Sequence, residues 1–457
     1  MRRIVGMSAG LLAVLALAGG GTVAAAPPGP AAPAPAERAA AAPAGTGAAE
    51  RPASVAPRPA AAAGRAAAAG PASAAAAAPA VPPAVPRAGR QRIGTVENVQ
   101  RRLSYADPSD RAVFRYPGAS YVKVHLSRAL LLPGDEVTVA DPAGTEVHRY
   151  RADALGAVAE LARGGRWAMS VPGDTAVVRL RRTLDPLGLR RALDRSGADL
   201  ARHGVTVDRV AHGLTPGERA ARRAGPGGPG REESICGADN KADAVCYRTS
   251  DPVAYRHSKA VVRLLIDGTE LCTGWRVGPD NRLLTNNHCF ARSEEAYNTE
   301  VWFNYQCARC RGFEVFRPTK VWGDRVLYTD RTLDLTVFTV ENFAEIRGFG
   351  HLELDPVRPV RGDQVYIPQH PAGEPTVIAM ASDVDRAGNC AVVDPAYDGY
   401  GVDTDVSYYC DTEGGSSGSP VLSRRTGRVV ALHHFGGCPN SGVRADLIHQ
   451  RIQHLLG

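Results

Sequence analysis

The chain has 457 residues, which is more than one typical domain requires. It has a formal net charge of +7, and 44% of its residues are hydrophobic. Its arginines are scattered and form no basic block alternating with aromatic residues, which argues against a nucleic-acid partner. No segment after the N-terminal region offers the roughly 20 uninterrupted apolar residues of a membrane span, so we expect no membrane anchor.

The first 92 residues fall into two stretches of unusual composition. Residues 1–26 combine Arg2 and Arg3 with an apolar run and end in three alanines, which is the pattern of a secretory signal peptide. Residues 27–92 are mostly Ala, Pro, Gly and Arg, which cannot bury a core, so we expect a disordered linker. The composition therefore predicts a secreted protein.

A strand pattern begins in the next segment, residues 93–182. Its alternating stretches are separated by turns rich in Pro and Gly, and the clearest are residues 121–126, 135–139 and 176–180. We predict a small β-sandwich that serves as an accessory or pro-domain. Residues 183–232 are expected to be a linker with one helical piece near residues 187–193.

The strand pattern returns in the last segment, residues 233–457. Many short strands with Gly and Pro turns are typical of an all-β domain. We expect a final helix at residues 446–456 and strands at residues 260–265, 301–303, 364–367, 376–379 and 428–432.

A glycine-flanked serine is the clearest sign of chemistry in this segment. Ser417 has a glycine two residues before it and another directly after it, whereas its neighbours Ser416 and Ser419 do not. A serine hydroxyl needs an adjacent base before it can act as a nucleophile. His288 and Asp334 precede it in that order, and the chain order His, Asp, Ser differs from that of subtilisin and of the α/β-hydrolases.

The aspartate has two rivals nearby, Asp324 and Asp330. Only Asp334 directly precedes an apolar stretch, residues 335–340, and we therefore favour it.

The three segments around these residues resemble the trypsin-like, chymotrypsin-fold serine peptidases. Within that class the chain is most similar to secreted bacterial lysyl endopeptidases, on the runs Cys272-Thr273-Gly274, Asn304-Tyr305-Gln306 and 412–420. The resemblance covers residues 236–457 and implies two six-stranded barrels with the triad in the cleft between them. It implies peptide-bond hydrolysis through an acyl-enzyme, with the backbone N–H groups of Gly415 and Ser417 as the oxyanion hole.

The resemblance leaves the substrate preference open. Asp411 matches a pocket aspartate of trypsin and Glu413 a pocket glutamate of lysyl endopeptidases, which favours cleavage after Arg or Lys. A loop that carries a further pocket aspartate in lysyl endopeptidases is missing after Cys438. Two alternatives remain: a glutamyl-specific endopeptidase that uses His433, and a non-catalytic trypsin-like binding module. It also stays open whether His433 and His434 touch substrate at all.

The sequence contains no obvious switch that would keep the expected peptidase inactive before activation. Ser416 stands where trypsin has an aspartate that captures the new N-terminus after activation. Any latency would have to come from the N-terminal region covering the cleft or from incomplete disulfides.

Nine cysteines in a chain with an export signal favour disulfides over metal or redox sites. We expect a bond between Cys272 and Cys289, because it would tie a strand to the loop that holds His288. The resemblance implies three further assignments: Cys236 with Cys438, Cys246 with Cys310, and Cys390 with Cys410, with Cys307 left over. We expect no metal and no cofactor. The expected partners are protein or peptide substrates, with no nucleic acid and no membrane, and the protein is expected to be a monomer.

Overall fold

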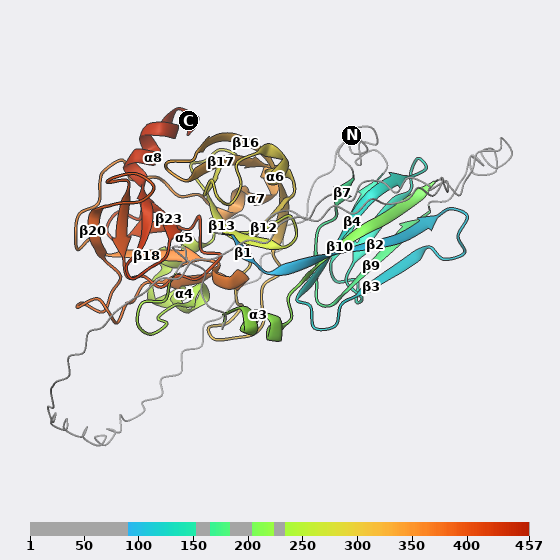
Figure 1. The fold of residues 1–457 in the computed structure, drawn as a ribbon, viewed down its shortest axis with the longest axis horizontal. Coiled ribbons are helices and arrows are strands. Elements are labelled where there is room, and N and C mark those ends of the chain that lie inside the picture. Colours follow the sequence, from blue (N-terminus) through green and yellow to red (C-terminus); the bar gives the residue numbers. More distant parts are fainter. Residues whose placement is uncertain (1–89, 152–164, 183–202, 224–233, 457) are drawn as a thin grey trace, which may run out of the picture. The chain divides into compact units, whose positions relative to one another are not determined.

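The structure, a computed structural model, describes residues 90–151, 165–182, 203–223 and 234–456, which all fall within one compact unit. The expected signal peptide, residues 27–89 of the expected linker and the helical piece near 187–193 lie outside the described residues. The predicted all-β class is confirmed, because the described chain consists mainly of antiparallel strands with a few short helices (Figure 1).

The N-terminal part of the described chain is a sandwich of two antiparallel sheets. The sheets have the orders β2-β10-β4-β7, with β8 also paired to β4, and β3-β9-β5-β6. Alternate apolar side chains such as Val124 and Val178 point into one shared core. The strand bounds are β2 Gly94–Ser104, β3 Arg111–Arg115, β4 Tyr121–Leu130, β5 Glu136–Ala140, β6 Val147–Arg151, β7 Arg166–Trp167, β8 Val171–Pro172, β9 Thr175–Arg181 and β10 Gly204–Gly213.

One part of the predicted linker belongs to this sandwich. Residues 204–213 form β10, which lies between β2 and β4, so the prediction that residues 183–232 are only a linker was wrong. The physical reason is the alternation of Val205 and Val207, whose side chains enter the sandwich core. Helix α3, Pro216–Arg223, follows the strand.

The first barrel of the C-terminal part is built from six strands. Their order is β13-β12-β15-β16-β17-β14, and a further pairing of β13 with β14 closes the ring. Buried side chains including Leu264, Phe290 and Phe338 fill its interior. The bounds are β12 Val261–Ile266, β13 Glu270–Arg276, β14 Leu283–Thr285, β15 Thr299–Phe303, β16 Thr319–Asp330 and β17 Leu335–Val340.

A second barrel has the strand order β18-β22-β23-β24-β21-β20. A bridge between Gln364 and Ala391 closes it, while β19 and β11 extend from β18. The bounds are β11 Ala242–Asp243, β18 Val365–Gln369, β19 Val377–Ala379, β20 Val392–Tyr397, β21 Asp405–Tyr408, β22 Pro420–Ser423, β23 Val429–Phe435 and β24 Asn440–Arg444. The described α-helices of the C-terminal part, both barrels together, are α4 Tyr247–Ser250, α5 Pro252–Ser258, α6 Ser293–Tyr297, α7 Phe343–Ile346 and α8 Ala445–Ile452.

The two barrels share an apolar cluster. It joins Trp275 and Leu284 of the first barrel to Leu422 and Leu432 of the second. Two residues of this cluster, Leu333 and Leu335, flank Asp334. The packing of the barrels therefore places Asp334 at the boundary between them.

A short strand, β1 at Gln91–Arg92, is added to the first barrel. It pairs antiparallel with β13, so the prediction that the disordered linker extends through residue 92 was wrong for these residues. They are held by the exposed edge of β13 and by ion pairs of the preceding residue, Arg90.

The sandwich and the first barrel meet at a cluster of charged side chains, which we call the buried junction: Lys123, Glu146, Ser170, Glu300 and Lys320. Nζ of Lys123 lies 2.7 Å from Oε1 of Glu300, and both side chains are 0% exposed. Ser170 donates to Glu300 through its N–H (2.9 Å) and its hydroxyl (2.8 Å). Nζ of Lys320 lies 2.6 Å from Oε1 of Glu146. A buried charge requires such partners, so the two parts are linked by more than apolar contact.

Three disulfides are present in the described chain: Cys236–Cys438, Cys246–Cys310 and Cys272–Cys289. The expected bond between Cys390 and Cys410 is wrong in this structure, where both are buried thiols. Sγ of Cys390 donates to the carbonyl of Ala381 at 3.4 Å, and the two thiols are hydrogen-bonded to each other without a covalent bond.

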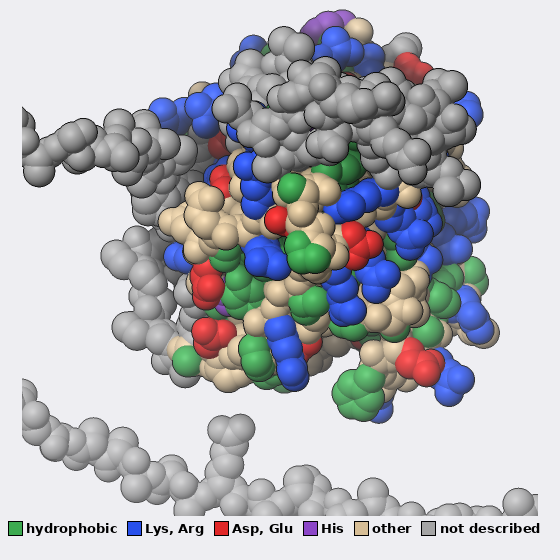
Figure 2. All heavy atoms as spheres, turned by 90° about the vertical axis from the view of Figure 1, so that its right-hand side faces the viewer, with side chains coloured by type: hydrophobic (Ala, Val, Ile, Leu, Met, Phe, Trp, Pro, Cys, Tyr) green, Lys and Arg blue, Asp and Glu red, His purple; other side chains and the backbone are tan. Residues whose placement is uncertain are grey.

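Among the described residues, no helix has the length and apolar character needed to cross a membrane. On the face shown in Figure 2, basic side chains lie among acidic and apolar ones instead of gathering in one field.

Candidate active site

Ser417 lies on a tight turn that two glycines make possible. Gly415 has φ +102° and Gly418 has φ +89°, a region that side chains other than glycine rarely adopt. A Cβ at position 418 would lie 2.1 Å from the carbonyl oxygen of Thr273. The turn is thus pressed against β13, and neither glycine can be replaced without moving the backbone.

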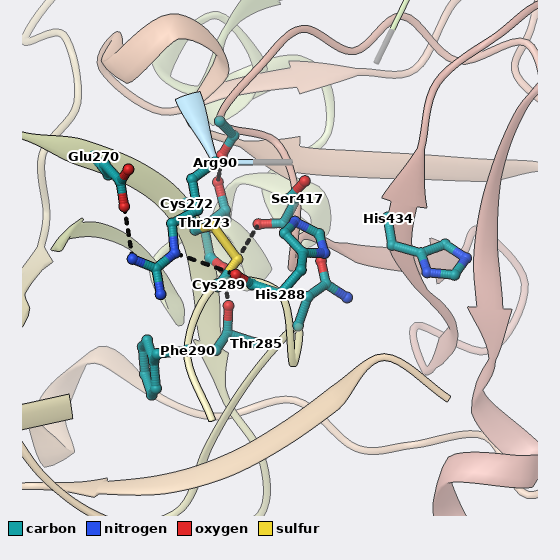
Figure 3. The surroundings of a disulfide bond; sticks show 12 residues. Arg90, Glu270, Cys272, Thr273, Thr285, His288, Cys289, Phe290, Ser417 and His434 are labelled. Atoms are coloured by element: carbon teal, nitrogen blue, oxygen red, sulfur yellow. Dashed lines mark hydrogen bonds and ion pairs between the residues drawn. A yellow bond between two sulfur atoms is a disulfide. The ribbon is translucent and has the colours of Figure 1, made fainter. Parts of the chain in front are cut away.

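The backbone of Ser417 is attached to the first barrel. Its carbonyl accepts the N–H of Thr273 at 2.9 Å, and Sγ of Cys289 lies 3.9 Å from the same oxygen. The disulfide between Cys272 and Cys289 joins β13 to the loop that carries His288, and Figure 3 shows this disulfide beside Ser417. This disulfide therefore connects β13, to which the backbone of Ser417 is bonded, with the loop that carries His288.

His288 is held by Asp334 at two points. Nδ1 of the ring lies 2.7 Å from Oδ2, and the backbone N–H of His288 donates to Oδ1 at 2.9 Å. Asp334 has a φ of 42°, in the left-handed region that Asp adopts more readily than most residues. Nε2 of His288 is buried and has no hydrogen-bond partner in the described part of the chain. It is the ring nitrogen left to accept a proton.

The two rival aspartates, Asp324 and Asp330, hydrogen bond to other residues. Asp330 accepts the N–H groups of Thr332 and Leu333, and Asp324 accepts the hydroxyl of Thr339. Neither carboxylate is bonded to His288.

The serine rivals are likewise engaged in the turn itself. The hydroxyl of Ser416 accepts the N–H of Glu413 at 3.3 Å, and the hydroxyl of Ser419 donates to the carbonyl of Ser416.

The geometry of the turn also bears on the expected oxyanion hole. The N–H of Ser416 donates to the carbonyl of Glu413, and that of Gly418 to the carbonyl of His433. Among the described residues the N–H of Gly415 makes no hydrogen bond within the protein. Gly415 therefore has a donor that the fold itself does not use.

A second histidine, His434, is bound to the other side of Asp334. Its Nδ1 lies 3.1 Å from Oδ2 of Asp334, and its Nε2 lies 2.7 Å from Oδ2 of Asp405. The hydroxyl of Ser441 also donates to this oxygen of Asp405, at 2.8 Å. Because ionised carboxylates only accept hydrogen bonds, both ring nitrogens of His434 must donate, and the ring is an imidazolium.

The charges of these neighbouring side chains shift the pKa values of His434 and Asp334. Burial alone would lower the pKa of His434, but Asp405 and Asp334 outweigh it and raise the pKa to about 9. Burial alone would raise the pKa of Asp334, but His288 and His434 outweigh it and hold the pKa far below its usual range. Asp334 is therefore ionised at neutral pH.

The predicted pocket carboxylates have partners within the protein. Asp411 is fully buried, and its two oxygens accept the N–H groups of Cys236 (2.9 Å) and Asn240 (2.8 Å). Burial raises the pKa of Asp411. Oε1 of Glu413 lies 3.2 Å from Nζ of Lys241.

The predicted pocket histidine, His433, is fully buried on β23. Its Nδ1 lies 2.7 Å from the hydroxyl of Tyr408, while Nε2 has no hydrogen-bond partner in the described part of the chain. Burial, together with the neighbouring charge of His434, lowers the pKa of His433 to about 3, so the ring is neutral.

One group of possible metal ligands lies close together, Cys272, His288 and Cys289. The two sulfurs are joined in a disulfide and offer no thiolate, so this group does not fit a metal ion.

Residues 272–432 match the family model described as the trypsin-like peptidase domain. This stretch of the chain is therefore similar to that domain. The matched range contains His288, Asp334 and Ser417, and it begins at Cys272 of the disulfide beside them.

Several proteins are similar to this chain. "Secreted RxLR effector protein 73" of Plasmopara viticola is 41% identical over 225 residues, which is 47% of this chain and 54% of that protein. "Uncharacterized protein y4fB" of Sinorhizobium fredii is 32% identical over 195 residues, covering 39% of this chain and 28% of that protein. The chain thus spans about half or less of these curated relatives. The solved structure of the Rv3671c protease from M. tuberculosis in its active form is 15% identical, with a TM-score of 0.34, and covers 50% of this chain and 92% of that one.

The contacts of His434 and Asp405 with Asp334 and with each other were not predicted from the sequence. The signal was present in part, since two successive histidines on one strand must point to opposite faces. One of them, His433, was considered for the pocket. Nothing in the sequence indicated that Asp405 lies beside the other.

Proposed function

We propose that this protein is a serine endopeptidase in which Ser417 is the nucleophile and His288 the general base. Asp334 would orient His288 and stabilise its protonated form. The proposal is carried by the 2.7 Å contact between Nδ1 of His288 and Oδ2 of Asp334. An imidazole held through Nδ1 presents Nε2 on its far side, and Figure 3 draws His288 next to Ser417.

The proposed reaction uses these groups in a fixed order. The hydroxyl of Ser417 attacks the substrate carbonyl while Nε2 of His288 takes its proton, and His288 then gives that proton to the leaving amine. The oxyanion formed in each step would accept the N–H groups of Gly415 and Ser417, and removal of one such donor costs about 2.7–4 kcal/mol in transition-state stabilisation. Water then hydrolyses the acyl-enzyme with His288 again as base.

For the residue before the cut bond we propose Arg or Lys. Asp411 and Glu413 are the carboxylates near the turn that would attract a cationic side chain. Each carboxylate oxygen can accept more than one hydrogen bond, so the backbone bonds of Asp411 leave room for such a partner.

One observation favours a second candidate, cleavage after Glu. The neutral ring of His433 has its buried Nε2 without a partner among the described residues, and a protonated Nε2 could donate to a substrate carboxylate. A pocket of this kind would not need Asp411, which would then be a structural residue that holds Cys236 and Asn240.

We further propose that the protein is secreted and acts as a monomer on protein or peptide substrates, without nucleic acid or membrane partners. Support for secretion comes from the three disulfides, which persist in oxidising compartments. The word "secreted" in the name of the Plasmopara relative points the same way.

The first experiment is labelling with a fluorophosphonate, followed by turnover of an ester and a peptide. Wild type and Ser416→Ala should label and turn over, while Ser417→Ala should do neither and remain folded. A wild-type protein that folds but does not label would favour the non-catalytic binding module. Equal loss in Ser416→Ala and Ser417→Ala would overturn the assignment of Ser417.

The second experiment is a peptide-library profile of wild type, Asp411→Asn and His433→Gln. Cleavage after Arg or Lys that falls steeply in Asp411→Asn supports the basic pocket. Cleavage after Glu that is lost in His433→Gln supports the alternative. We choose the amide in place of a smaller residue at 411, because it keeps one acceptor for the backbone of Cys236 or Asn240.

A further inference from the structure

Arg90 is inserted into a cluster of acceptors beside the proposed nucleophile. Its Nη1 lies 2.6 Å from Oε2 of Glu270, its Nη2 3.0 Å from Oε1 of Glu295, and its Nε donates to the carbonyl of His288 at 3.2 Å. The Arg90 side chain is 4% exposed and each glutamate side chain 10%. A buried guanidinium with three directed bonds is bound specifically by its surroundings, in contrast to a loose ion pair on the surface.

The backbone around Arg90 is bound as a strand. Gln91 pairs with Leu271 and Arg92 with Glu270, and the N–H of Ile93 donates to the carbonyl of Thr269 at 2.8 Å. This strand, β1, lies on β13 outside the closed ring of six strands. Extended peptides bind to sheet edges in this way, with main-chain bonds giving affinity and side-chain pockets giving specificity.

The strand begins at the proposed active site. A Cβ at Gly414 would lie 2.1 Å from Oε1 of Gln91, so that side chain covers the turn three residues before Ser417. A Cβ at Gly415 would lie 2.6 Å from Cδ2 of Leu271, the residue that pairs with Gln91. Figure 3 draws Arg90 near His288 and Ser417.

The direction of β1 identifies which half of a substrate it imitates. A peptide that is being cut passes the nucleophile, and the residues on the C-terminal side of the cut leave with the new amine. From Arg90 to Ile93 the chain runs away from Ser417 in the N-to-C direction. It therefore has the place and the polarity of the leaving peptide, with Arg90 at its first position.

We propose that Glu270 and Glu295, with the carbonyl of His288, form a subsite for an arginine side chain at the first position after the cut bond. In the intact chain Arg90 fills this subsite, and β1 competes with substrate for the edge of β13. This inference rests on the proposed function, because it concerns the leaving-group side of the same site. Two nearly buried carboxylates strongly disfavour an empty subsite, so a cationic side chain is the ligand class that fits.

The test compares quenched peptides that differ only in the residue after the cut: Arg, its uncharged isostere citrulline, or Gln. Proteins with Arg90→Gln, which removes the three bonds of the guanidinium and so weakens the hold of β1 on the edge of β13, should cleave the Arg peptide at least about tenfold better than the citrulline peptide. The same substitution should raise kcat/KM for the Arg peptide above that of wild type. A ratio near one in Arg90→Gln would overturn the subsite.

The variant Arg90→Gln/Glu270→Gln/Glu295→Gln provides the second arm. Its ratio of Arg to citrulline peptide should fall to near one, while the matched control Arg90→Gln/Glu353→Gln should keep the ratio of Arg90→Gln. A retained preference in the triple variant would overturn the assignment of the two glutamates. The peptide comparison in Arg90→Gln alone stays decisive if the triple variant does not fold.

Fluorophosphonate labelling of the same preparations separates this inference from the proposed function. Absence of labelling in every folded variant would remove the proposed function itself. Normal labelling with equal cleavage of the three peptides would remove only the arginine subsite.

Discussion

Oδ2 of Asp334 lies 3.1 Å from Nδ1 of His434 and accepts from His288 as well. One carboxylate oxygen is therefore shared between the proposed general base and an imidazolium that stays charged at neutral pH. The second nitrogen of that imidazolium is neutralised by Asp405. His434 is thus connected to the proposed general base through Asp334.

Removal of His434 should destabilise the protein. His434→Ala leaves Asp334 and Asp405 buried without their shared cation, and a broken buried pair typically costs about 3–5 kcal/mol. Urea unfolding at pH 7 measures the loss. His454→Ala, which removes an exposed imidazole, is the control and should unfold like wild type.

The pH dependence of stability should show the same residue. Because folding raises the pKa of His434 from 6.5 to about 9, its contribution is complete below pH 6.5 and is lost as the pH rises through 9. The difference in unfolding free energy between wild type and His434→Ala should shrink across that range. A difference that stays constant from pH 6 to pH 9.5 would mean that His434 is not charged.

The proposed triad should respond as one unit. Asp334→Asn and His288→Ala should each lower kcat by about 10⁴, and the double variant should lose no more than either. Single-turnover hydrolysis of an ester substrate measures these rates, and Asp330→Asn serves as the control. An additive penalty in the double variant would mean that the two residues act separately.

Loss of the disulfide beside Ser417 should affect stability and turnover together. Cys272→Ser/Cys289→Ser should lose about 2–5 kcal/mol of unfolding free energy, the usual range for such a bond in a secreted domain. Turnover should fall too, since the bond connects the support of Ser417 to the loop of His288. Cys307→Ser, at a cysteine that is a thiol in the structure, is the matched control.

The buried junction should make the stability of the protein sensitive to acid. Burial alone would raise the pKa of Glu300, but Lys123 and Lys320 outweigh it and lower the pKa to about 2 from 4.5. This contribution is complete above pH 4.5 and is lost as the pH falls toward 2. Glu300→Gln should cost about 3–5 kcal/mol at pH 7 and much less near pH 2. Glu341→Gln, at a partly exposed ion pair, is expected to change little at either pH.

Local patterns predicted much of this fold. The apolar run after Asp334 became β17, and the glycines around Ser417 became a left-handed turn, because both signals are contained in a few adjacent residues. Residues 204–213 were harder to assign, since the neighbours of β10 lie about 80 and 100 positions earlier in the chain.

The sites that sequence reasoning missed depend on contacts between distant segments. Arg90 meets Glu270 across a separation of 180 residues, and no pattern near either residue announces the other. His434 and Asp405 are joined by the pairing of β23 with β24 and of β24 with β21. Such relationships are products of topology and appear only once the strands have been placed.

The buried junction has a consequence for the fate of the sandwich. Separation of the two parts would expose Lys123 and Glu300 to water only after their mutual bond and the two bonds from Ser170 had been broken. A single cut in the polypeptide between the sandwich and the two barrels would therefore not release the sandwich. The product would be a nicked, two-chain particle whose halves co-migrate on a sizing column and separate only in denaturant.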